Sequence, residues 1–153
     1  AGCDLAGYRP GENGALFSPQ GGLRASMRDL AVIGQMLLKN DGSFLKRESI
    51  AQIERVAWRY DGSNGDTSNG FYCQYGLGMT MLPTAHDICA DDLFGDGRTR
   101  IGHAGDAYGL RSGLWIDRVK GTGVAFFATA TPPDSKGFTA FTVEEERLAR
   151  EKD

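Results

Sequence analysis

The sequence has no run that approaches the about 20 consecutive apolar residues needed to cross a bilayer, so we expect no membrane-spanning helix. Its 17 Lys and Arg residues are scattered and the formal net charge is −3, so the basic surface typical of a nucleic-acid partner is not expected either. The chain starts at Ala1 without a basic-then-apolar leader, which predicts that a signal peptide is absent or already removed. What remains is an ordinary globular chain of 153 residues, long enough to bury one core.

Candidate metal ligands are few or badly spaced. Two histidines and three dispersed cysteines show no paired spacing of the kind that zinc sites use. Acidic residues do gather in two polar stretches, and their oxygen atoms are of the type that Ca²⁺ prefers. Neither stretch has the Asp-x-Asp-x-Asp-Gly spacing, so we interpret both as solvated loops and expect no cofactor. The residues concerned are Asp61, Asp66, Asp87, Asp91, Asp92 and Asp96.

Three cysteines allow at most one internal disulfide. Cys73 and Cys89 flank the candidate strand 75–82 and could close a small loop in an oxidising compartment. The alternative is two unpaired thiols in a reducing cytosol. Cys3 is left over in either case.

Periodicity and turn signals predict helices and strands in a definite order. The 22 glycines are about twice the usual share of roughly 7%, as expected for antiparallel sheet with tight loops. Ser26 with Asp29 and Thr142 with its acidic first turn predict two helix starts. We expect helices from residue 27, over 47–59 and over 142–150, and strands over 71–82, 100–106, 110–117 and 122–131 with a turn at 117–121. This order is α+β, an antiparallel sheet flanked by helices, in a single domain or fragment spanning 1–153.

Three segments carry a resemblance to a known family. The run Ile101-Gly102-His103-Ala104-Gly105-Asp106 enters a Gly-rich bend and two further strand patterns. Phe17-Ser18-Pro19-Gln20-Gly21-Gly22-Leu23 leads into Ser26-Met27-Arg28-Asp29-Leu30-Ala31, and Leu45–Ile50 opens the next helix. In this order the segments resemble the second half of the serine β-lactamase and penicillin-binding-protein hydrolases, over most of residues 17–150. The resemblance implies that this chain begins after that family's Ser-x-x-Lys helix.

The resemblance also implies a site. The His103 side chain would point into the cleft and help bind or polarise an acyl group, and Gly105 would keep the strand surface bare for substrate. The backbone N–H of Asp106 would be an oxyanion-hole donor, a contribution worth about 3–4 kcal/mol where such donors have been removed. The alternative for His103 is an ordinary surface histidine in a strand.

The nucleophile of that family is not evident in this sequence. A literal Ser-x-x-Lys occurs at Ser43-Phe44-Leu45-Lys46, but it follows Asn40-Asp41-Gly42 in a short connector, so we interpret it as a coincidence. None of the five tyrosines begins a Tyr-x-Asn motif. We therefore expect this chain alone to be inactive.

Two functional hypotheses follow. The first is the C-terminal segment of a periplasmic or secreted serine hydrolase acting on ester, amide or β-lactam substrates. Its partners would be a small acyl substrate and the missing N-terminal half of the domain, and His103 in place of lysine favours an esterase or peptidase. The alternative is a non-catalytic binding or structural domain that retains only the sheet.

Overall fold

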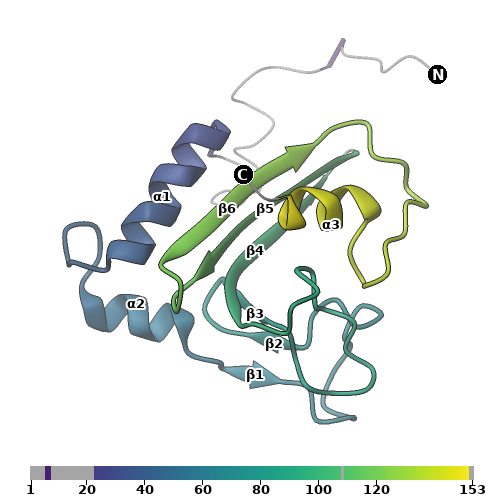
Figure 1. Cartoon of the computed structure of the whole chain (residues 1–153), viewed down its shortest axis with the longest axis horizontal. Helices are drawn as coiled ribbons and strands as arrows, with labels where there is room; N and C mark the ends of the chain where they lie inside the picture. The colour runs from purple at the N-terminus through teal and green to yellow at the C-terminus, as the bar shows by residue number, and fades with distance from the viewer. Residues whose placement is uncertain (1–5, 8–22, 108, 152–153) are drawn as a thin grey trace.

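The structure, a computed structural model, describes residues 6–7, 23–107 and 109–151. The described part holds one antiparallel sheet in the order β1-β2-β3-β4-β5-β6 (Figure 1). The helices are α1 (Met27–Lys39), α2 (Arg47–Glu54) and α3 (Val143–Arg150). The strands are β1 (Trp58–Arg59), β2 (Gln74–Tyr75), β3 (Thr80–Leu82), β4 (Arg100–Ala107), β5 (Leu110–Asp117) and β6 (Thr122–Ala128). The predicted α+β class with an antiparallel sheet is confirmed.

The long strands carry a core on both faces of the sheet. Trp115 and Ile116 are consecutive in β5, so their side chains leave opposite faces. Trp115 belongs to a buried cluster that includes Ala149 of α3. Ile116 packs instead with Leu37 of α1 and Ile50 of α2. The sheet therefore lies between α3 on one face and α1 with α2 on the other, and α3 crosses in front of β4 and β5 in Figure 1.

Both predicted helix starts are confirmed by their hydrogen bonds. Ser26 Oγ accepts from the Asp29 N–H at 3.2 Å, and the Asp29 carboxylate accepts from the Ser26 N–H at 2.8 Å. Thr142 and Glu145 repeat this capping box at α3. Each box satisfies two backbone N–H groups that a helix start otherwise leaves open.

Three predicted boundaries are wrong. Residues 71–82 form a hairpin of β2 and β3 rather than one strand, because the chain turns back after Tyr75: Gly76 N–H donates to Met79 O at 2.7 Å, and Gly78 has φ +80°. The second helix ends at Glu54, and Trp58–Arg59 pairs with β2 as a strand. The last strand ends at Ala128, before Ala130 takes a positive φ of 58°.

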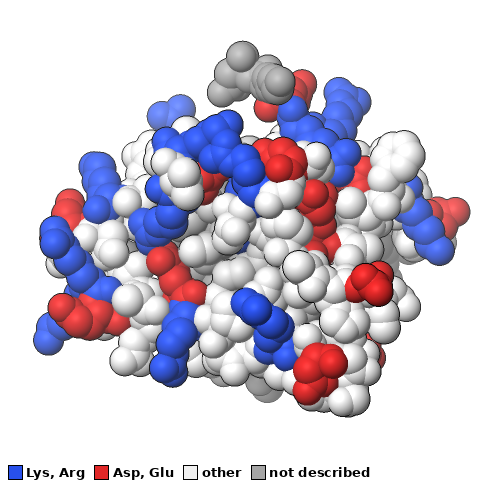
Figure 2. Space-filling view, turned by 60° about the horizontal axis from the view of Figure 1, so that its bottom comes forward, with Lys and Arg blue, Asp and Glu red and all other residues white. Residues whose placement is uncertain are grey.

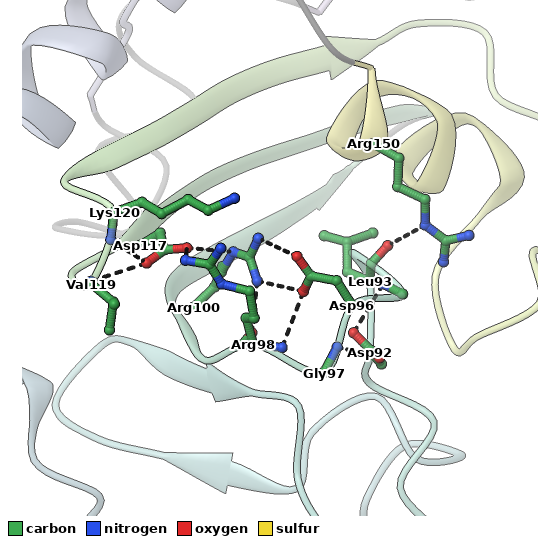
Figure 3. Close-up of polar contacts among 11 residues, drawn as sticks. Asp92, Leu93, Asp96, Gly97, Arg98, Arg100, Asp117, Val119, Lys120 and Arg150 are labelled. Carbon is green, nitrogen blue, oxygen red and sulfur yellow. Dashed lines mark hydrogen bonds and ion pairs between the residues drawn. The ribbon is translucent and has the colours of Figure 1, made fainter.

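The connection between β3 and β4, residues 83–99 (the excursion 83–99), is held against the sheet by a disulfide and by ion pairs. Cys73 and Cys89 are bonded, with their Cα atoms 6.1 Å apart, so the predicted pairing is confirmed. Asp96 pairs with Arg100 at 2.7 Å, and Asp117 at the end of β5 accepts from Arg98 at 2.6 Å (Figure 3). Elsewhere acidic and basic side chains alternate over the face drawn in Figure 2.

Candidate functional site

Half of strand β4 has an unpaired edge. β3 pairs with β4 only from Arg100 to Gly102, whereas β5 pairs with it from Ile101 to Ala107. Among the described residues, no strand therefore pairs with positions 103–107 on the β3 side. All three predicted site residues lie in this stretch. An extended ligand could add to such an edge as a further strand does.

His103 is exposed and hydrogen-bonded at both ring nitrogens. Nε2 lies 2.5 Å from the Tyr75 hydroxyl, and Nδ1 lies 2.5 Å from the Ala104 carbonyl oxygen. Its ring meets the Tyr75 ring edge-on, at 5.8 Å between centroids, and lies 6.4 Å from the Tyr72 ring. The imidazole is thus the centre of a small aromatic group at the open edge.

Gly105 stands directly opposite Ser112 of β5. A Cβ built at Gly105 would lie 2.4 Å from Ser112 Oγ, a side-chain atom that can rotate away. At Gly102 the nearest atom would be the Leu114 carbonyl oxygen, at 1.9 Å, which belongs to the paired backbone. The close approach of β5 therefore requires a glycine at position 102. Gly105, by contrast, leaves the strand without a side chain two residues after His103.

Asp106 lies one residue further along the same edge, and its side chain is committed to an ion pair. Its carboxylate pairs with Arg111, the residue opposite it on β5. The carboxylate is 62% exposed and the Arg111 side chain 22% exposed, so solvent screens the pair. The β4–β5 pairing therefore holds the backbone of Asp106, and its side-chain ion pair adds little.

A cavity of about 800 Å³ adjoins this end of β4. Ala104, Gly105 and Asp106 line one side of it, and the segment 133–142 with the start of α3 lines another. Tyr72 also lines it; burial raises the pKa of Tyr72, and neighbouring Tyr75, Asp106 and Glu145 raise it further. Burial likewise raises the pKa of Tyr75. Both phenols are therefore neutral hydrogen-bond donors at neutral pH.

Ser43 and Lys46 lie apart from this site. Both are exposed in the bend between α1 and α2; Ser43 N–H donates to Asp41, and Lys46 is the residue that precedes α2. Neither opens a buried helix, as a catalytic pair of this type must.

The acidic side chains of the two polar stretches make local hydrogen bonds and ion pairs. Asp61 accepts from the backbone of Ser63 and Asn64, and Arg100 holds the pKa of Asp96 down at about 2. Asp91 is buried and accepts from Thr84, and burial raises its pKa. Across residues 6–7, 23–107 and 109–151, no group of three or more His, Cys, Asp or Glu side chains is arranged to hold a metal ion.

The sequence does not point to Tyr75 or Arg111 as site residues. The pattern over 71–82 predicts a single strand, and only the hairpin of β2 and β3 brings the Tyr75 hydroxyl to His103. Arg111 gave no motif of its own, and the register that sets it opposite Asp106 is a property of the sheet.

Comparison with known proteins agrees with the resemblance of the three segments. The family model described as Beta-lactamase matches residues 2–149. No curated protein and no solved structure matches the chain significantly. No helix among the described residues is long and apolar enough to span a membrane. Since the family model covers nearly the whole chain, the chain belongs to the Beta-lactamase family.

Proposed function

We propose that this chain supplies one wall of the active site of a serine hydrolase that acts on ester, amide or β-lactam substrates. The observation that carries the proposal is the open edge of β4, on which an exposed His103 and a bare Gly105 follow one another in a member of the Beta-lactamase family. An acyl substrate would lie extended along this edge, with its carbonyl near the Asp106 backbone.

Each residue has a separate role in this proposal. His103 binds or polarises the acyl group, and Gly105 leaves room for the substrate chain above the strand. The Asp106 N–H donates to the oxyanion that forms when the carbonyl is attacked. The pairing of Asp106 with Arg111 in the β4–β5 ladder positions that backbone.

The nucleophile would come from a Ser-x-x-Lys helix in the N-terminal half of the same domain. The exposed connector position of Ser43 and Lys46 supports this division. Phe127 of β6 is 52% exposed, and β6 is the last strand of the described sheet. An apolar side chain at an unpaired edge is suited to being covered by further elements of the domain.

Two further observations support a choice of substrate class and of compartment. A histidine at position 103 does not supply the permanent cation that a lysine would offer to a substrate carboxylate, which favours an esterase or peptidase over a β-lactamase. The Cys73–Cys89 disulfide supports a periplasmic or secreted location, where such bonds persist.

The proposal is tested with a chromogenic β-lactam and a short-chain p-nitrophenyl ester. We expect no turnover by this chain alone. A longer protein that also contains the Ser-x-x-Lys helix should turn over the ester faster than the β-lactam. Turnover by this chain alone that disappears in Ser43→Ala would overturn the assignment of the nucleophile.

A second candidate is a non-catalytic binding or structural domain. It is favoured by the absence of a buried Ser-x-x-Lys helix from the described residues. Binding of the ester by the longer protein, without any release of p-nitrophenol, would support this candidate and contradict hydrolysis.

A further inference from the structure

The hydrogen bonds of His103 determine which nitrogen carries the proton. The Ala104 carbonyl oxygen can only accept, so Nδ1 must carry the hydrogen in the 2.5 Å contact between them. In the neutral ring Nε2 is then an acceptor, and the Tyr75 O–H is the donor in the second 2.5 Å contact. The two contacts therefore agree on one tautomer.

Tyr75 is anchored firmly although β2 has only two residues. Its backbone pairs with Trp58 on one side and Thr80 on the other. Two residues earlier Cys73 is fully buried and bonded to Cys89. Thr80 Oγ1 also donates to the Gln74 carbonyl at 2.8 Å. The phenol thus projects from a backbone that is held on both sides.

The position at which β3 begins explains how Tyr75 reaches His103. β3 begins at Thr80, which stands opposite Gly102, so no strand occupies the next position between β2 and β4. The Tyr75 side chain spans this gap and closes it with the contact to Nε2.

We propose that Tyr75 is a positioning residue for His103 in the site described above: its hydroxyl donates to Nε2 and orients the imidazole, while the Ala104 carbonyl keeps the proton on Nδ1. An exposed histidine otherwise turns freely about its last torsion and exchanges tautomers. With both nitrogens bound, the ring presents one orientation to an arriving acyl group. This inference rests on the proposed function for its catalytic consequence but not for the hydrogen bond itself.

The chain contains a matched control. Tyr60 packs edge-on against the other histidine, His86, with 5.1 Å between ring centroids. His86 Nδ1 accepts from the Ile88 N–H instead of a tyrosine hydroxyl. Tyr60→Phe therefore removes a tyrosine hydroxyl group beside the other histidine, and neither residue belongs to β4.

The first measurement is nitrogen NMR of the histidine rings at a pH where they are neutral. In the unchanged chain we expect His103 with a protonated Nδ1 and an unprotonated, hydrogen-bonded Nε2. Tyr75→Phe should move the Nε2 resonance of His103, whereas Tyr60→Phe should leave it in place. A protonated Nε2, or a resonance unmoved by Tyr75→Phe, would overturn the proposal.

The second measurement is a double-mutant cycle in the longer protein that contains the Ser-x-x-Lys helix. Tyr75→Phe should lower kcat/KM about two- to tenfold, the range to which the net contribution of one hydrogen bond converts. In a His103→Ala background the same change should have no effect, because Tyr75 acts through the imidazole. An equal loss in both backgrounds would make Tyr75 merely structural and contradict its positioning role.

The two measurements separate the two ideas. If His103→Ala leaves kcat/KM unchanged, the proposed function of the site fails, and the NMR result still decides the hydrogen bond. If His103→Ala lowers kcat/KM but Tyr75→Phe does not, the site stands and the positioning role is refuted.

Discussion

Two glycines of β4, only three residues apart, should respond very differently to the addition of one methyl group. At Gly102 a Cβ would lie 1.9 Å from the Leu114 carbonyl oxygen and 2.9 Å from the Trp115 Cα. Both are backbone atoms of the strand paired with β4, so Gly102→Ala must separate β4 from β5. At Gly105 the Cβ would meet only Ser112, at 2.4 Å from Oγ, and that hydroxyl can turn away.

The expected magnitudes differ accordingly. Overpacking of a rigid backbone costs about 3 kcal/mol or more, the upper part of the usual range. For Gly105→Ala the cost of turning Ser112 is offset by the lower entropy of the unfolded chain, so the net change should stay within about 1 kcal/mol. In a domain of this size, about 3 kcal/mol corresponds to a fall in Tm of roughly 6–12 °C.

Urea unfolding followed by circular dichroism measures both free energies of unfolding. Gly102→Ala should lower the midpoint strongly, and Gly105→Ala should not. Ser112→Ala combined with Gly105→Ala should recover any small loss, because it removes the contacting hydroxyl. Equal stability of Gly102→Ala and Gly105→Ala would refute the close approach of β4 and β5.

Two further predictions concern the excursion 83–99. Mass spectrometry of the unreduced chain should find the Cys73 and Cys89 peptides linked, and free alkylation of both thiols would contradict the bond. Replacing both cysteines by serine should lower the free energy of unfolding by about 3 kcal/mol, because the disulfide closes a loop with a sequence separation of 16. The folded pKa of Asp96 is about 2, below its ordinary 3.8, so the Asp96–Arg100 contribution should be complete above about pH 4 and be lost as the pH falls through 2. Because the Asp96 side chain is 40% exposed, screening should reduce this contribution to less than about 1 kcal/mol. Asp96→Asn should flatten that part of the pH–stability curve, and an unchanged curve would show that the ion pair contributes nothing.

The sequence predicted best where the signal is local. Ser26 and Thr142 each have an acidic residue three positions later, and both cap helices as expected. The turn at 117–121 is confirmed because Asp117 accepts from the N–H groups of Val119 and Lys120. These contacts lie within a few residues, so short patterns are enough to specify them.

Prediction failed where pairing between distant segments decides the outcome. The alternation from Phe71 to Leu82 fits one strand equally well, and only the fold back at Gly76 and Gly78 makes it a hairpin. The contact of Tyr75 with His103 joins residues 28 apart and depends on where β3 begins. No periodicity in the sequence contains that information.

We propose above that His103 belongs to the wall of an acyl-hydrolase site. The most direct test is steady-state kinetics of His103→Ala in the longer protein proposed above, with a Ser-x-x-Lys helix, and with His86→Ala as the matched control. We expect a fall in kcat/KM of tenfold or more, about 1.4 kcal/mol of lost transition-state stabilisation, for His103→Ala alone. Unchanged kinetics in His103→Ala, with the fold intact, would contradict it and reduce His103 to an ordinary strand residue.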